Sequence, residues 1–448
     1  MERYSSYKDS DISWIGDIPS HWEVKRIASL FTGKVQANTD FKYHHAFKFY
    51  YGTLVPKNEV GDFEEYRDTY VKYSVLQKDD IMINGLNLNY DFVSQRVAIA
   101  PSDGIITSAY VVARPRKGTN ALYYNYLFKT MDNMKLFHGM GTGIRLTLSF
   151  DEMKKQVVVV PPQDEQRTIV DYIEDKASKI DAYVADKEKE IELLQELKQK
   201  TIADAVTKGL NPDAKMKDSG ISWIGEIPEH WETRRAKFMF IKNKRERRPE
   251  DEVITCFRDG QVTLRKNRRL TGFTESEKYD GYQGIRKGDL VIHQMDAFAG
   301  SIGVSDSDGM GTSVYHCCTP IGDFNVYYYA YLIRQMAMSG FIQSLYKGIR
   351  ERSSDFSFPV FGNQFLLIPP INEQQTIVAF IEEKCQKIDK LASELQSEID
   401  YLKEYKQRLI ADCVTGQVNV AGSESRGGLL TMPSQSNVTK SNVQNETI

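Results

Sequence analysis

The longest hydrophobic pattern in this chain occurs twice, at residues 161–207 and again at residues 369–415. After a leading pair of prolines, apolar or small side chains recur every three or four positions, with one lysine among them and no further proline or glycine. That spacing is typical of a helix with a single apolar seam, as in a coiled coil. The seam positions are Ile173, Ala177, Ile180, Val184, Lys187, Ile191 and Leu194 in the first segment and Ile381, Cys385, Ile388, Ala392, Leu395, Ile399 and Leu402 in the second.

Each of these segments is too long to be the buried helix of an ordinary domain. At 1.5 Å of rise per residue it would extend roughly 65 Å. Gly209 and Gly416 follow the two segments as stop signals. Two equal seams in one chain can bury each other, and they run antiparallel if the halves are related by a pseudo-twofold axis. The alternative is that each helix is a solvated, charged rod without a partner.

A second repeated motif stands near the start of each half. DSDISWIGDIPSHWE at residues 9–23 returns as DSGISWIGEIPEHWE at residues 218–232, with twelve of fifteen positions identical. We call these two segments the tryptophan boxes. No nucleophile or carboxylate accompanies His21 or His230. We therefore interpret the tryptophans and histidines as packing and turn residues that seat a domain on its helix, and set a catalytic role aside as the alternative.

The region between each box and the following helix differs between the halves but keeps traces of one domain. KDDIMI at residues 78–83 matches KGDLVI at residues 287–292, and ALYYNYL at 121–127 matches VYYYAYL at 326–332. Short β-branched runs between Gly, Asp and Asn predict strands, and each Tyr-rich segment predicts one helix. We expect an α+β fold with a pseudo-twofold internal repeat, in which two diverged domains are joined by two long helices that form an antiparallel coiled coil.

The expected boundaries follow from these motifs. Residues 1–160 form the first variable domain and residues 161–208 the first long helix. Residues 209–368 form a linker and the second variable domain, and residues 369–417 the second long helix. The tail at residues 418–448 is polar and low in complexity, so we expect it to be disordered.

Composition and motif content argue against an enzyme. The formal net charge is −3, so a nucleic-acid partner would have to bind to local basic patches. The five cysteines lack metal-ligand spacing, which indicates a reducing compartment and no zinc site. The sequence contains no phosphate-binding loop, no amino-methyltransferase motif and no glycine fingerprint for a cofactor. With no signal sequence or membrane span, we expect a non-catalytic, cytoplasmic protein that binds no cofactor or metal itself.

Basic and amide side chains are the candidates for contacting DNA, because Arg and Lys bind phosphates while Asn, Gln and Arg discriminate base edges. In the first variable domain they are Asn84, Asn87, Asn89, Tyr90, Gln95, Arg96 and Arg145. In the second they are Lys242, Lys244, Arg245, Arg265, Lys266, Arg268, Arg269, His293, Gln294, Arg350 and Arg352. The alternative for any one basic run is an exposed loop that its charge keeps soluble.

The order of these motifs resembles the specificity subunit of type I DNA restriction-modification systems. The resemblance rests on the ISWIGxIPxHW box, present twice, and on PPQDEQRTIVDYIE and PPINEQQTIVAFIEEK at the starts of the long helices. It covers nearly all of residues 9–420. It implies that the variable domains are target recognition domains, each reading one half of a bipartite, asymmetric site in double-stranded DNA. The helices would set the spacing between the half-sites and dock methyltransferase subunits.

The resemblance also implies partners that carry the chemistry. Two methyltransferase (modification) subunits would methylate adenine with S-adenosylmethionine, and restriction/translocase subunits would add ATP- and Mg-dependent DNA cleavage. These cofactors would belong to the partners and none to this chain, and no membrane would be involved. The alternative from another class is a non-enzymatic coiled-coil scaffold whose two domains bind proteins or glycans.

Overall fold

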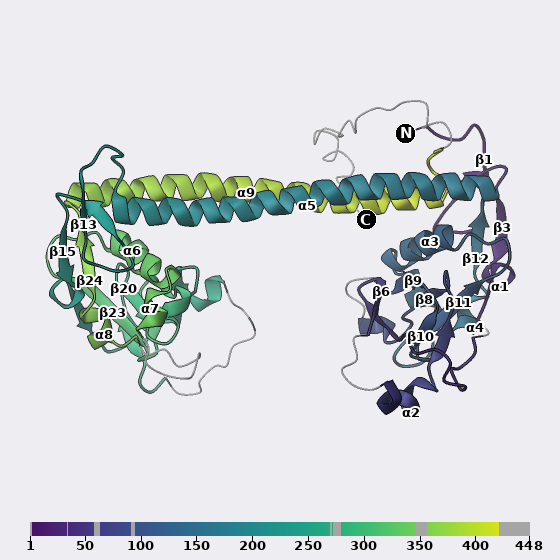
Figure 1. Ribbon diagram of the computed structural model, residues 1–448, viewed down its shortest axis with the longest axis horizontal. Helices are drawn as coiled ribbons and strands as arrows, with labels where there is room; N and C mark the ends of the chain where they lie inside the picture. Colours follow the sequence, from purple (N-terminus) through teal and green to yellow (C-terminus); the bar gives the residue numbers. More distant parts are fainter. Residues whose placement is uncertain are drawn as a thin grey trace. The chain divides into compact units, whose positions relative to one another are not determined.

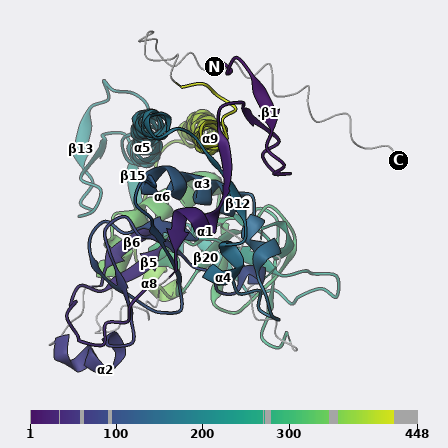
Figure 2. The same ribbon diagram turned by 90° about the vertical axis from the view of Figure 1, so that its right-hand side faces the viewer.

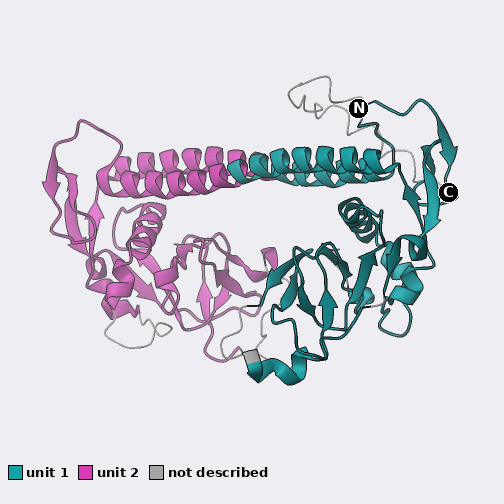
Figure 3. Cartoon of the chain, turned by 45° about the vertical axis from the view of Figure 1, so that its right-hand side comes forward, with its two compact units in different colours: residues 1–186, 398–448 teal, residues 187–397 magenta. Residues whose placement is uncertain are grey.

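The computed structural model describes residues 2–33, 35–57, 63–90, 95–268, 271, 279–345 and 356–420. The chain divides into two compact units, which Figure 3 colours separately. Unit 1 comprises residues 1–186 and 398–448, and unit 2 comprises residues 187–397. Each unit therefore contains one variable domain together with parts of both long helices.

The two repeated segments form long helices (Figure 1). Helix α5 spans Gln163–Lys208 and helix α9 spans Ile371–Val414. Every seam position predicted from the sequence is buried or partly buried. The most buried are Ile173, Ile180, Val184, Ile381, Leu395, Ile399 and Leu402. The predicted seam is thus confirmed, and the glycines that follow the helices both adopt a positive φ of 75°.

In each unit α5 and α9 pack against each other, and they run in opposite directions. Asp181 of α5 pairs with Lys406 of α9 in unit 1, and Lys198 of α5 pairs with Asp389 of α9 in unit 2, both at 2.6 Å. As the residue numbers along α5 rise from 181 to 198, those of their partners in α9 fall from 406 to 389. The two helices are therefore antiparallel, as predicted. Figure 2 shows the two helices end-on, next to one another.

The first and last strands of each variable domain pair at the start of a long helix. In unit 1 β3, Glu23–Arg26, pairs antiparallel with β12, Val157–Val160. In unit 2 β15, Glu232–Arg235, pairs in the same way with β24, Phe365–Ile368. Since β12 and β24 lead directly into the proline pairs before α5 and α9, each domain is closed beside the helix that follows it.

Each variable domain contains the same antiparallel four-stranded sheet. In unit 1 the order is β4, β11, β8 and β9, at Phe31–Thr32, Val111–Pro115, Ile81–Ile83 and Val97–Ile99. In unit 2 it is β16, β23, β20 and β21, at Phe240–Asn243, Tyr315–Pro320, Leu290–His293 and Ile302–Val304. The Tyr-rich segments form the predicted helices α3, Ala121–Asn133, and α6, Val326–Met338. The equal strand order confirms two copies of one α+β domain.

The two-stranded sheets also correspond between the units. Two-stranded sheets in unit 1 are β1–β2 (Tyr7–Asp9, Asp17–Pro19), β5–β6 (Phe47–Tyr50, Thr53–Pro56) and β7–β10 (Ser74–Leu76, Gly104–Ile106). In unit 2 they are β13–β14 (Met216–Asp218, Glu226–Pro228), β17–β18 (Ile254–Cys256, Val262–Leu264) and β19–β22 (Gln283–Ile285, Gly309–Gly311). Short helices are α1 (Ile27–Leu30), α2 (Arg67–Tyr70) and α4 (Phe150–Met153) in unit 1, and α7 (Phe341–Ser344) and α8 (Phe358–Gly362) in unit 2.

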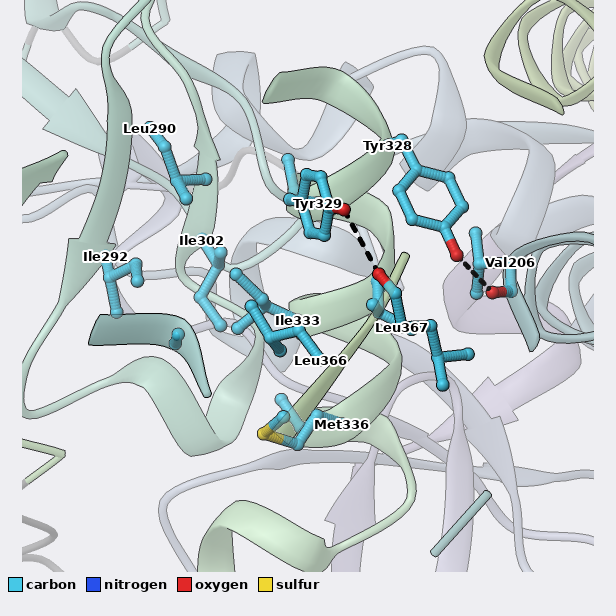
Figure 4. Packing of buried hydrophobic residues seen from close by; sticks show 14 of the residues in the cluster. Val206, Leu290, Ile292, Ile302, Tyr328, Tyr329, Ile333, Met336, Leu366 and Leu367 are labelled. Carbon is cyan, nitrogen blue, oxygen red and sulfur yellow. Dashed lines mark hydrogen bonds between the residues drawn. The ribbon is translucent and has the colours of Figure 1, made fainter. Parts of the chain in front are cut away.

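Buried tyrosines attach each domain helix to a long helix and to the last strand. In unit 2 the Tyr328 hydroxyl donates to the Val206 carbonyl near the end of α5 at 2.8 Å, and the Tyr329 hydroxyl donates to a carbonyl of β24 at 3.1 Å (Figure 4). In unit 1 the Tyr123 hydroxyl donates to the Val414 carbonyl of α9 at 2.7 Å. Burial raises the pKa of Tyr123 and Tyr328, so both hydroxyls stay protonated and can donate.

Replacing Tyr328 with Phe removes this buried hydrogen bond and keeps the ring. We expect the free energy of unfolding to fall by about 1–2 kcal/mol, because the Val206 carbonyl also loses its partner. Tyr327→Phe is the matched control, since the Tyr327 side chain, in the same helix, is 48% exposed. Urea unfolding measures both variants. Equal stabilities would show that the bond does not hold the domain on its helix.

Candidate nucleic-acid interface

Each tryptophan box contacts the first turn of a long helix. His21 Nε2 lies 2.8 Å from a carboxylate oxygen of Glu165 in α5, and His230 Nε2 lies 2.7 Å from Glu373 in α9. The indole of Trp231 donates to the second Glu373 oxygen at 2.8 Å. These contacts confirm that the boxes seat the domains on the helices. The sequence pattern alone did not identify the two glutamates as their partners.

A buried arginine holds the loop that follows β8 in unit 1. The half-buried Asn84 donates its backbone N–H to the Arg96 carbonyl at 2.8 Å. The Arg96 guanidinium donates to the carbonyls of Leu86 at 2.7 Å and Asn87 at 3.3 Å, and the residue is only 9% exposed. Its backbone N–H donates to the Asp132 carboxylate of α3 at 2.7 Å. The geometry gives Arg96, one of the candidate contacts, a positioning role in this loop.

The other side chains of this loop are polar and point outward. Asn87, Asn89, Tyr90 and Gln95 are exposed, and Tyr90 has 67% of its surface accessible. Leu88 between them is fully buried and anchors the backbone. Asn87 adopts a left-handed φ of 51°, which asparagine tolerates better than most residues. The loop therefore presents amide and phenol groups from a fixed backbone.

The segment around Gly143, Ile144 and Arg145 of unit 1 joins the same loop through backbone hydrogen bonds. The Leu88 N–H donates to the Leu146 carbonyl at 3.0 Å, and the Leu148 N–H donates to the Gly85 carbonyl at 2.9 Å. Arg145, adjacent to Leu146, is exposed. The structure thus brings Arg145 beside candidate residues that are distant from it in the sequence.

The loop after β20 in unit 2 is held by a corresponding link. The Phe356 N–H donates to the Gln294 carbonyl at 3.1 Å. His293 Nδ1 accepts from two following backbone N–H groups at 3.2 and 3.0 Å, so the neutral ring carries its proton on Nε2. Burial lowers the pKa of His293, which favours the neutral ring near pH 7. This position therefore offers an imidazole and an amide where unit 1 offers asparagines and a tyrosine.

Neighbouring groups engage most of the basic candidates that the structure describes in unit 2. The ion pairs are Arg245–Asp289, Lys266–Glu252 and Arg268–Asp259, at 2.5 to 2.7 Å, and Arg265 donates to the Thr255 hydroxyl at 3.4 Å. Lys242 and Lys244 are exposed and form no ion pair with any described residue. Arg269, Arg350 and Arg352 lie outside the described residues.

One of these ion pairs belongs to the frame of the domain. The side chain of Asp289, which precedes β20, is only 2% exposed, so Arg245 compensates a buried charge. Asp80 precedes β8 at the equivalent position in unit 1, and it pairs with Arg114 at 2.7 Å. Arg245 therefore has a structural role that its place in a basic run did not reveal.

The described ranges contain no group of three or more His, Cys, Asp or Glu side chains that could hold a metal ion. The five cysteines are free thiols. No helix within the described ranges has the length and apolar character needed to cross a membrane.

We expect Arg96→Ala to loosen the loop that presents Asn87 and Asn89. Discrimination between matched and mismatched DNA should fall by about 1–3 kcal/mol, while the salt dependence of binding should stay the same because the guanidinium faces carbonyls. Arg145→Ala is the comparison variant, and removal of its exposed charge should lower the salt slope by about one. Fluorescence anisotropy across about 50–200 mM salt measures both quantities. A lower slope in Arg96→Ala would contradict the positioning role.

Comparisons with known proteins agree with this arrangement. Residues 19–193 match the family model described as the type I restriction modification DNA specificity domain. A chain solved in work on complex assembly and conformational transition of the type I R-M system is 15% identical, with 90% of this chain and 99% of that chain covered and a TM-score of 0.66. The HsdS subunit from Thermoanaerobacter tengcongensis is also 15% identical, with 90% and 98% covered and a TM-score of 0.51. A comparison with curated protein sequences found no significant match.

At this level of identity the solved structures establish the fold, and the family model establishes the domain. The matched residues include most of the first variable domain and much of α5. The second half repeats the box, the strand order and the long helix of that matched half. The first half of the chain therefore contains a type I restriction modification DNA specificity domain, and the second half repeats its fold.

Proposed function

We propose that this subunit reads a bipartite, asymmetric site in double-stranded DNA, with one half-site for each variable domain. The proposal rests on one observation. The two domains share the same backbone arrangement, but the loop after the equivalent strand carries different side chains in each. A corresponding backbone link holds the loop after β8 and the loop after β20. The first loop exposes Asn87, Asn89 and Tyr90, whereas the partly buried His293 and Gln294 occupy the second. Different donors and acceptors at one position favour different base sequences.

We assign the two kinds of DNA contact to different residues. Exposed amides such as Asn87 and Asn89 are suited to base edges, because an amide can pair with adenine through two hydrogen bonds. Exposed cations that pair with no carboxylate in the described part of the chain, such as Lys242 and Lys244, are suited to phosphates. Lys266 and Arg268, by contrast, would have to exchange a carboxylate partner for a phosphate.

We further propose that the helix pair docks two methyltransferase subunits, which bind S-adenosylmethionine, and that restriction/translocase subunits join this complex and use ATP and Mg. Equivalent positions of the repeat carry exposed apolar side chains. Tyr183 and Tyr401 in unit 1 are 41% and 37% exposed, and Leu391 and Leu193 in unit 2 are 41% and 54% exposed. Exposed apolar groups at repeated positions favour two copies of one partner.

The experiment that tests the reading function is enrichment of a random duplex pool by this chain with its methyltransferase subunits. We expect two short motifs separated by a fixed gap. His293→Ala with Gln294→Ala should relax one motif, and Asn87→Ala with Asn89→Ala should relax the other. A single contiguous motif, or no sequence preference, would refute the proposal.

The paired helices also predict how the gap between half-sites is set. Four residues inserted in α5 after Lys187 would displace one domain by about 6 Å along the helix and shift the seam by about one turn. We expect the preferred gap to change or the domains to become uncoupled. A matching insertion in α9 between Asp389 and Lys406 should restore the pairing of the seams and give a new, fixed gap. An unchanged gap in the single insertion would exclude the spacing role.

A subunit that reads chromosomal DNA acts where that DNA lies, and we therefore propose a cytoplasmic location. The rival hypothesis, a scaffold whose domains bind proteins or glycans, gains no support from the family model, which describes a DNA specificity domain. The enrichment experiment separates the two, because a scaffold would recover no DNA motif.

A further inference from the structure

Two adjoining cavities of unit 1 lie where α3 approaches the end of α9. Their volumes are about 270 and 360 Å³, and both are lined by Lys129, Asn133, Lys406 and Gln407. In Figure 1, α3 and the strands β6 and β9 lie beneath this part of α9. The cavities are therefore bounded by the variable domain on one side and by the long helix on the other.

Lys129 is the central basic group of this site. It stands in the second half of α3 and forms no ion pair with any described residue. Desolvation lowers its pKa, and repulsion from Lys406 lowers it further. A partly buried ammonium beside a second ammonium is costly unless an anion joins it. The site therefore favours a negatively charged ligand.

The remaining polar groups of the cavities leave a net positive charge. Lys403 and Lys406 of α9 also line them, and Lys406 pairs with Asp181 of α5 at 2.6 Å. Asp132 adds a second carboxylate, which already accepts the Arg96 N–H at 2.7 Å. The lining therefore carries three lysines and two carboxylates, and one of these carboxylates, Asp181, is paired with Lys406. Amides and hydroxyls complete the lining with uncharged donors, at Tyr126, Thr130, Asn133 and Gln407.

The outer wall of the larger cavity belongs to the candidate DNA interface. It includes Gln95, which is exposed beside the positioning residue Arg96, and Tyr51, which is 63% exposed at the turn between β5 and β6. A linear polyanion that contacted Gln95 would pass the lysines of α9.

The equivalent basic residue in unit 2 has a different environment. Arg334 occupies the position in α6 that Lys129 occupies in α3. Its guanidinium lies against Gly260 and donates to the Arg258 carbonyl at 3.5 Å. In unit 2 the protein's own backbone thus provides an acceptor, whereas in unit 1 the ammonium faces a cavity.

We propose that this cleft binds a phosphate of the DNA backbone, so that α9 contributes directly to DNA binding and not only to spacing. The inference rests on the proposed DNA-reading function. In the cleft, Lys129 and Lys403 each contact a phosphate oxygen. These contacts hold the DNA on one side of the half-site that unit 1 reads. Such contacts carry no base information but fix the register of the domain on the duplex.

The test uses the full chain with its methyltransferase subunits and a duplex recovered by the enrichment experiment. Lys129→Gln and Lys403→Gln should each lower the salt slope of binding by about one and weaken affinity several-fold at low salt. Lys129→Arg should retain the slope. Lys200→Gln, an exposed charge on α5, is the matched control and should behave as the wild type. Phosphate-ethylation interference should reveal one blocked position that disappears in Lys129→Gln.

Three results would separate the possible failures. Unchanged slopes and an unchanged interference pattern in folded Lys129→Gln and Lys403→Gln would overturn the phosphate site. Weaker binding of the methyltransferase subunits with unchanged slopes would also overturn it, because the cleft would then hold a carboxylate of a partner protein. A wild-type complex without sequence preference would instead refute the proposed function. Lys403→Gln keeps the test decisive if Lys129→Gln fails to fold.

Discussion

The structure depends on the burial of the apolar seam that each long helix carries. A helix of this length with one apolar face is stable in water only when another surface covers that face. Here the partner is the other long helix, and the antiparallel direction places the start of one beside the end of the other in each unit. Each variable domain is then attached to both helices at once. Its box contacts the first turn of one, and a buried tyrosine of its domain helix bonds to the end of the other.

This arrangement separates the part of the domain that must be constant from the part that can vary. The constant part includes the pairing of first and last strands, the central sheet and a buried aspartate before the central strand that an arginine neutralises. Among these, the inner strands of the sheet and the aspartate are buried, and removing one partner of a buried ion pair costs about 3–5 kcal/mol. The loop after the central strand is fixed by backbone hydrogen bonds, so its exposed side chains can differ without disturbing the frame. A specificity subunit needs this separation to read different sequences with one fold.

The basic residues divide in the same way, into those held by groups of the frame and those that remain exposed. With a net charge of −3, DNA binding has to come from local groups, and the number of basic residues in a run does not measure that capacity. Arg245 and Arg268 are held by carboxylates, and Arg96 is held by loop carbonyls. Exposed cations that form no ion pair within the described residues, such as Lys242 and Lys244, are better placed for phosphates. Lys129 is the opposite case, because it is partly buried and forms no ion pair with any residue that the structure describes.

The sequence by itself determined the two helices, their seams and the duplication of the domain, because long periodic patterns and repeated motifs carry that information locally. Their antiparallel pairing was an expectation drawn from the repeat, and the ion pairs between α5 and α9 confirm it. It also identified the boxes as structural. Only the tertiary structure decided which candidates face outward, because exposure depends on contacts between distant segments: Leu88 with Leu146, Arg96 with the loop carbonyls, and Arg245 with a buried aspartate. For the same reason no local pattern could reveal Glu165 and Glu373 as partners of the box histidines, or Lys129 beside the lysines of α9.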